Sequence, residues 1–218
     1  MSGSDDIEYF YAAHSAFAYI GAEMLGQVAK AGGRKIVHRP MHLGTVMKAA
    51  TPNSERGFTG SITLERTNYF FRREIERWAE YRGVPVMRGI PQYHYNDITL
   101  PNCLLIAAIE SAVDIDTLSH ALLQAHWRDD ADLANPDTLR GVADGCGCDG
   151  EALLEMAATP AIKAQYENNT AEAIERSVFG SPTYVVDGDM FYGQDHLELV
   201  AQAMKQPFRN TWPLFELA

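Results

Sequence analysis

The amino-acid sequence predicts an α/β protein in which a block of helices interrupts a single sheet. Three observations support this: a strand, a helix and a second strand over residues 7–40, helical spacing through the middle, and a hairpin with a helix at the end. This order is that of a thioredoxin-like fold with an all-helical insertion. We expect residues 1–45 and 179–218 to form a discontinuous thioredoxin-like domain and residues 46–178 to form the helical insertion.

The N-terminal unit is predicted to be a β-α-β crossover. Residues 7–11 read IEYFY, an apolar and aromatic run typical of a buried strand. Apolar side chains then recur on one helical face from Phe17 to Val28, and two glycines at 32–33 end that helix. Residues 35–39 (KIVHR) predict a second strand, which Pro40 closes. A crossover of this length joins parallel strands.

The middle and the end of the chain differ in periodicity. Apolar stripes predict helices near residues 71–79, 104–113, 118–125, 139–143, 153–156 and 162–178, with no strand between residues 45 and 180. Residues 183–186 and 189–192 then flank Asp187-Gly188, a pair favoured in two-residue hairpin turns because both positions need a positive φ. Apolar residues from Leu197 to Met204 predict a last helix.

Composition and charge exclude several classes of protein. The chain has 218 residues, 46% hydrophobic and 22% charged, which suits a globular protein that needs no disulfide or metal to fold. Its net charge of -11 repels nucleic-acid phosphates and anionic lipids, so we expect neither as a partner. No membrane span or signal peptide is recognisable, and three cysteines without a CxxC fit a reducing compartment, so we expect a cytoplasmic protein.

The first candidate site lies where the first helix begins, at the carboxyl end of the first strand. Ser15 there is either an N-cap or a hydroxyl that donates to a thiolate held at the helix N-terminus, which would lower the thiol pKa. Nothing nearby in the sequence makes Ser15 itself a nucleophile. His14 is either exposed and directed away, or a functional group beside Ser15.

Two more candidates lie in the C-terminal segment. Ser181-Pro182 is either an ordinary start of the hairpin or a cis proline whose backbone faces the first helix and pairs with a peptide-like ligand. Gly193-Gln194-Asp195 is either a helix cap or a nest for the charged end of an α-amino acid. Because the histidines form no HExxH motif and one CxC stands alone, we expect no metal site.

These segments resemble one family. Residues 179–188 (FGSPTYVVDG) and 191–195 (FYGQD) closely resemble the C-terminal signature of 2-hydroxychromene-2-carboxylate isomerases, relatives of kappa-class glutathione transferases and DsbA-type oxidoreductases. Residues 9–11 (YFY), 15–19 (SAFAY), 39–40 (RP), 43–44 (LG) and Lys48 resemble the same family, and the similarity spans nearly the whole chain. The resemblance implies a fold of the DsbA and kappa-class type.

The resemblance also implies glutathione as cofactor and a small aromatic carboxylate as substrate. The positions that contact glutathione correspond to Ser15, as the catalytic hydroxyl, and to Ser181, Pro182, Gly193, Gln194 and Asp195. The substrate side corresponds to His14, Lys48, Asn53 and Tyr93. The implied activity is isomerisation of 2-hydroxychromene-2-carboxylate in aromatic hydrocarbon catabolism, by conjugate addition of a thiolate and its elimination, and the implied assembly is a homodimer.

Other functions are open beside this one. A kappa-class-like glutathione transferase would act on another electrophile and consume glutathione, and a binding protein would keep only the fold. A DsbA-type disulfide oxidoreductase needs a CxxC at the first helix, where residues 14–17 read HSAF. The sequence departs from the isomerase pattern at His14, Ala16, Ser181 and His196 and around residues 93–95, which are mainly substrate-side positions.

Overall fold

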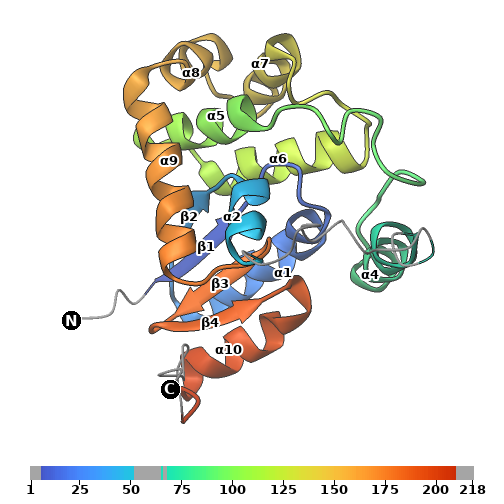
Figure 1. The fold of residues 1–218 in the computed structure, drawn as a ribbon, viewed down its shortest axis with the longest axis vertical. Helices are drawn as coiled ribbons and strands as arrows, with labels where there is room; N and C mark the ends of the chain where they lie inside the picture. The colour runs from blue at the N-terminus through green and yellow to red at the C-terminus, as the bar shows by residue number, and fades with distance from the viewer. Residues whose placement is uncertain (1–5, 52–64, 66–67, 210–218) are drawn as a thin grey trace.

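The computed structural model describes residues 6–51, 65 and 68–209, and its elements follow the predicted order (Figure 1). The chain begins with β1 (Ile7–Tyr11), α1 (Ala16–Gly32) and β2 (Ile36–Pro40). It ends with β3 (Thr183–Val186), β4 (Asp189–Tyr192) and α10 (Leu197–Lys205). All four strands form one sheet in the order β2-β1-β3-β4, so both ends of the chain share it. The predicted thioredoxin-like fold is confirmed, whereas the domain boundaries at 45 and 178 stay a prediction.

In the described part of the insertion between β2 and β3, all regular secondary structure is helical. It contains α2 (Leu43–Ala49), a π-helical turn η1 (Tyr69–Glu74) that continues as α4 (Ile75–Arg82), α5 (Thr99–Glu110), α6 (Ile115–Trp127), α7 (Pro136–Gly145), α8 (Gly150–Ala157) and α9 (Pro160–Glu175). The sequence did not predict α2, which is seven residues long and buries only Val46. α5 begins earlier than predicted because Pro101 is compatible with a first helical turn.

The sheet register explains where the site forms. β1 is parallel to β2, with Tyr11 opposite Pro40, and antiparallel to β3, with Phe10 opposite Thr183. The segments that follow β1 and β2 and the segment that precedes β3 therefore meet at one end of the sheet. The β3–β4 turn has positive φ at both Asp187 (52°) and Gly188 (87°), which confirms the predicted hairpin.

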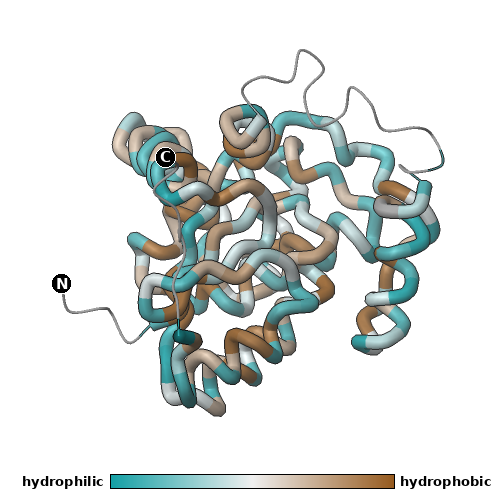
Figure 2. Tube along the Cα trace, turned by 60° about the horizontal axis from the view of Figure 1, so that its bottom comes forward, coloured by the Kyte–Doolittle hydropathy of each residue, from teal (hydrophilic) through white to brown (hydrophobic). Residues whose placement is uncertain are grey.

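Helices cover both faces of the sheet because its side chains alternate. Tyr9 and Tyr11 point into the larger core, with residues of α1, α5, α6 and α10. Phe10 and Val185 point the other way, into a smaller core with α2 and α9. The hydrophobic segments of the sheet lie between the helices that cover its two faces (Figure 2).

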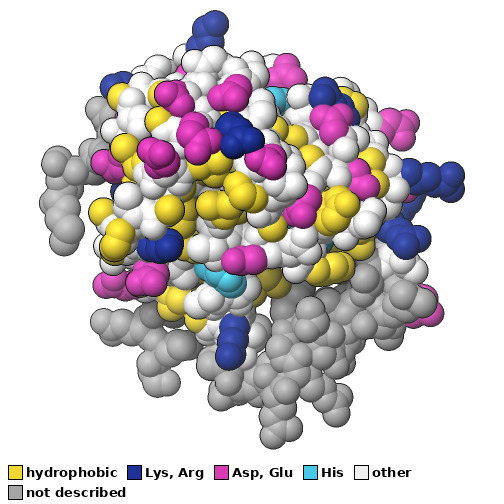
Figure 3. Space-filling view, turned by 90° about the horizontal axis from the view of Figure 1, so that it is seen from above, with side chains coloured by type: hydrophobic (Ala, Val, Ile, Leu, Met, Phe, Trp, Pro, Cys, Tyr) yellow, Lys and Arg dark blue, Asp and Glu magenta, His cyan; other side chains and the backbone are white. Residues whose placement is uncertain are grey.

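Charged side chains lie on the surface of the molecule. On the face seen from above, acidic, basic and hydrophobic side chains are interspersed (Figure 3). Among the described helices, none combines the length and the apolar character that crossing a bilayer requires.

Candidate functional site

Ser15 occupies the junction between β1 and α1. Its Oγ accepts a hydrogen bond from the Ala18 N–H at 3.3 Å, so Ser15 is the N-cap of α1. The same hydroxyl donates to the carbonyl oxygen of Ser181 at 3.1 Å. Ser15 is therefore a cap and also faces the loop that precedes β3.

That loop contains a cis peptide bond between Ser181 and Pro182. The Ser181 hydroxyl accepts from the buried Ala12 N–H at 3.2 Å, and the Pro182 carbonyl accepts from the Gly193 N–H at 2.9 Å. An aliphatic side chain at position 181 could not bond the Ala12 amide. The Ser181 hydroxyl thus links the cis-proline loop by a hydrogen bond to Ala12, in the segment just before Ser15.

Gly193 opens the turn that carries Gln194 and Asp195. Its φ of 95° lies in a region that favours glycine, and a Cβ there would overlap the Asp195 carboxylate. Asp195 lies in the first turn of η2 (Gln194–His196), which has no side-chain cap hydrogen bond, so the helix-cap and ligand interpretations both stay open. The Asp195 carboxylate is about half exposed and lies 3.5 Å from His196 Nδ1, free to meet a ligand cation.

Arg82, at the end of α4, holds Gln194 and was not found by sequence reasoning. Its guanidinium donates to the side-chain Oε1 of Gln194 at 3.1 Å and to the backbone oxygen of Gln194 at 3.3 Å. Because a guanidinium only donates, the amide oxygen must face Arg82 and the amide nitrogen must face away. Gln194 Nε2 is buried without a hydrogen-bond partner, so it is a donor available to an anionic group.

Asn102 supports the segment before Ser15 from the insertion. It is fully buried in α5, where its Oδ1 accepts from the Ala13 N–H at 3.1 Å and its Nδ2 donates to the Ile98 carbonyl at 2.7 Å. A polar side chain inside an otherwise apolar helix is the sequence signal that could have identified it.

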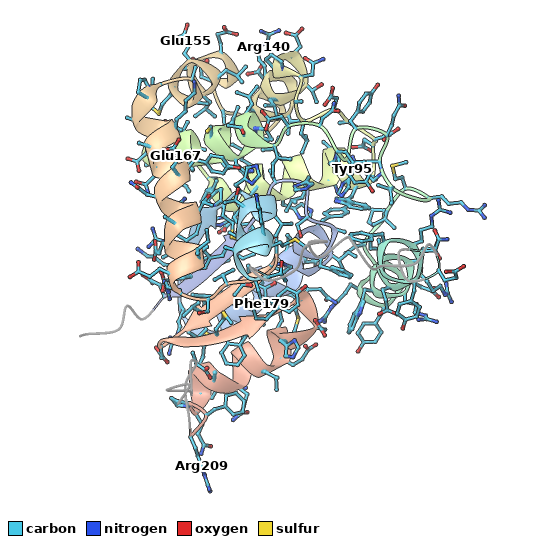
Figure 4. All side chains as sticks on the ribbon, viewed as in Figure 1. Tyr95, Arg140, Glu155, Glu167, Phe179 and Arg209 are labelled. Atoms are coloured by element: carbon cyan, nitrogen blue, oxygen red, sulfur yellow. The ribbon has the colours of Figure 1, made fainter. Side chains whose placement is uncertain are left out.

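His14 packs inward, so the expectation that it is exposed is wrong. Its ring centroid lies 5.0 Å from that of His94, and its backbone oxygen accepts from Trp127 Nε1 at 2.8 Å. Tyr95, next to His94, marks this loop beside α6 in Figure 4. Burial and the neighbouring His94 lower the pKa of His14 to about 3, and burial lowers the pKa of His94 to about 4. Both imidazoles are therefore neutral near pH 7.

The other substrate-side predictions are less well placed. Lys48 is exposed in the last turn of α2 and shares no hydrogen bond with Ser15 or Ser181 among the described residues. Tyr93 is 37% exposed on the loop before His94. Asn53 lies outside the described residues.

A cavity of about 470 Å³ opens among α2, α5 and α9. His42, which follows β2 at the same end of the sheet as Ser15, lines it together with Lys163 and Tyr166. Its volume suits a small aromatic molecule. A second cavity of about 560 Å³ runs along α1, β2 and α6, and Ser15 is not among its lining residues.

The cysteines are not arranged for redox or metal chemistry. All three are free thiols, and burial raises the pKa of Cys103 to about 11 and also raises the pKa values of Cys146 and Cys148. A raised pKa leaves little reactive thiolate at neutral pH. No group of His, Cys, Asp and Glu among the described residues has the arrangement of a metal site.

Comparison with known proteins identifies the family of this chain. A family model described as a DSBA-like thioredoxin domain matches residues 6–205. The chain belongs to this family. It is similar to a 2-hydroxychromene-2-carboxylate isomerase from Sphingobium xenophagum, with 27% identity over 197 residues that cover 89% of this chain and 95% of the relative. It is also similar to glutathione S-transferase kappa 1 from Homo sapiens, with 23% identity and coverage of 95% and 94%.

A solved structure of a 2-hydroxychromene-2-carboxylate isomerase has the same fold. It superposes with a TM-score of 0.77 at 23% sequence identity, covering 91% of this chain and 94% of that chain. The sequence resemblance to these isomerases, and to the wider DSBA-like family, is confirmed.

Proposed function

We propose that this protein is a glutathione-dependent isomerase acting on 2-hydroxychromene-2-carboxylate or a similar carboxylate of aromatic hydrocarbon catabolism. The observation that carries the proposal is the position of Ser15. Its hydroxyl sits at the N-terminus of a 17-residue helix and bonds the carbonyl that precedes a cis proline. Similarity to isomerases over most of the chain supports the same activity.

The residues around Ser15 fit glutathione. Gln194 Nε2 is a buried donor without a partner, which suits the γ-glutamyl carboxylate, and the half-exposed Asp195 carboxylate suits the α-ammonium. The Ser181 carbonyl, which accepts from the Ser15 hydroxyl, suits the cysteinyl N–H. The similarity to a kappa-class glutathione transferase supports the same ligand.

The single hydroxyl proton of Ser15 supports a role as hydrogen-bond donor to the glutathione sulfur. Without ligand, that proton lies toward the Ser181 carbonyl. The Ser181 carbonyl has two lone pairs and can accept a cysteinyl N–H, which would leave the Ser15 hydroxyl able to turn toward the sulfur while Oγ keeps the Ala18 N–H. This hydrogen bond and the partial positive charge of the α1 N-terminus both favour the thiolate.

Bound glutathione would supply a sulfur nucleophile for reversible addition to the conjugated double bond of the substrate. The chain itself has to hold the substrate carboxylate and orient the ring. We assign this role to His14, Lys48, Asn53 and Tyr93, as the resemblance implies. We extend the proposal to a cytoplasmic homodimer, as the resemblance implies.

A kappa-class-like transferase acting on another electrophile is the second candidate. The similarity to a kappa-class enzyme and the unusual His14 and Ser181 favour it. A count of free thiol during conversion separates the two. An isomerase leaves the thiol count unchanged, and a transferase loses one thiol for each product. If glutathione binds but 2-hydroxychromene-2-carboxylate is not converted, the isomerase proposal is wrong.

A further inference from the structure

Three histidines form a chain that ends beside Ser15. His94 Nδ1 lies 3.0 Å from His126 Nε2, and His126 Nδ1 lies 3.1 Å from the backbone oxygen of Ala131. At the other end, the ring of His14 packs against that of His94, with 5.0 Å between centroids. His14 Nδ1 is buried without a hydrogen-bond partner.

The terminal carbonyl determines where each proton lies. The Ala131 oxygen only accepts, so His126 Nδ1 must carry hydrogen, and in the neutral ring its Nε2 is then an acceptor. His94 Nδ1 must therefore donate to it. The only nitrogen that neutral His94 can offer to another group is Nε2, which holds a lone pair. These hydrogen bonds leave His94 Nε2 as a base that can accept a proton.

A positive charge is best placed on His94. Protonated His94 would donate a charge-assisted hydrogen bond to His126, which in turn donates to the Ala131 carbonyl, so both bonds strengthen together. Asp130 and Asp132 add negative charge near His126. A charge on His14 lacks this support, because His94, His126 and His42 disfavour it electrostatically and its Nδ1 has no partner. Because two positive charges would repel each other, His14 and His94 together can take up one additional proton but not two.

We propose that His94, with His14 beside it, takes up the proton that the glutathione thiol loses when it binds at Ser15. The S–H bond breaks, its electron pair stays on sulfur, and the proton binds the lone pair of His94 Nε2, so thiolate and imidazolium form together without a change in net charge. This step rests on the proposed function and adds an acid–base residue to it.

The ligand itself makes the step favourable. In the free protein, burial keeps the pKa of His94 at about 4. A thiolate bound within roughly 4–6 Å of His94 would raise the pKa of this imidazole by about 1–3. The imidazole therefore stays neutral until an anion arrives.

The experiment measures how many protons are released for each thiolate that forms. Glutathione is added to the whole protein at about pH 6.5, thiolate is measured by its ultraviolet absorbance, and released protons are measured with a pH indicator in weak buffer. The wild-type protein should release about half a proton or less for each thiolate formed. His94→Asn keeps a donor toward His126 but removes the base, so it should release about one proton per thiolate.

His120→Asn is the matched control. His120 lies on α6 against Tyr19, with 5.6 Å between ring centroids, and it is outside the histidine chain. Its proton count should equal that of the wild-type protein. A full proton per thiolate from the wild-type protein, equal to the His94→Asn value, would overturn the inference and leave the proposed function intact. Absence of thiolate from the wild-type protein would overturn both.

Nitrogen NMR of the imidazole rings gives a second test that needs no variant. Without glutathione, His94 and His126 should both be neutral with hydrogen on Nδ1. With saturating glutathione, both nitrogens of His94 should carry hydrogen. A His94 ring that stays neutral with glutathione bound, or that carries its hydrogen on Nε2 in the free protein, would contradict the inference.

Discussion

Replacing Ser15 with alanine tests the centre of the site, because it removes two hydrogen bonds at once. Loss of the N-cap to Ala18 costs about 1 kcal/mol of stability, and loss of the donor to the buried Ser181 carbonyl costs about 1 kcal/mol more. For a chain of this size, about 2 kcal/mol corresponds to a Tm lower by about 4–8 °C. In the enzyme, loss of a hydrogen bond to a developing thiolate should lower kcat/KM by about 10- to 1000-fold.

The assay compares kcat/KM and Tm with those of a matched variant. Thr159 caps α9 in the same manner: its hydroxyl accepts from the Ile162 N–H at 3.4 Å and donates to the Met156 carbonyl at 2.7 Å. Thr159→Ala should lower Tm to a similar degree and leave the rate unchanged. If Ser15→Ala folds and keeps the full rate, Ser15 is only a cap and the proposed role in thiolate formation is wrong.

Three further variants test the surroundings. Arg82→Met should leave the Gln194 amide unsupported and raise the Kd for glutathione by about 10- to 150-fold in calorimetry, since one hydrogen bond to a charged group contributes about 1.5–3 kcal/mol; an unchanged Kd would reject the role of Gln194. Asp195→Ala should also raise the Kd for glutathione, and equal Kd values for glutathione and for a ligand without the α-ammonium in the wild-type protein would argue against that contact. Arg34 holds the pKa of Asp187 below its usual value, so this ion pair should contribute stability above the unfolded pKa of about 4 that is lost as pH falls through the lower folded pKa. Arg34→Met should therefore remove less than about 1 kcal/mol of pH-dependent unfolding free energy. Identical acid unfolding curves for the variant and the wild-type protein would show that the pair adds no stability.

The fold was predictable because local rules determine its two ends. Alternation and helical spacing locate the strands and α1, and Asp187-Gly188 specifies the hairpin since both residues need positive φ. α2 was missed because seven residues with one buried side chain carry no periodic pattern.

The sequence predicted a site residue only where neighbouring residues indicate its position in the fold. Ser15 follows a strand and precedes a helix, so its position is readable from the sequence. Contacts between distant segments are not readable: Arg82 and Gln194 are 112 positions apart, and His94 meets His126 only because a loop folds against α6. The sequence also could not decide whether Pro182 is cis, because both isomers suit the start of a strand.

The most direct test of the account is an ultraviolet time course of 2-hydroxychromene-2-carboxylate with the enzyme, run with and without a catalytic amount of glutathione. We predict a spectral change to the benzylidenepyruvate that requires glutathione, continues past one turnover per glutathione molecule, and leaves the thiol unconsumed. Conversion at the same rate without glutathione, or no conversion by protein that binds glutathione, would contradict the account.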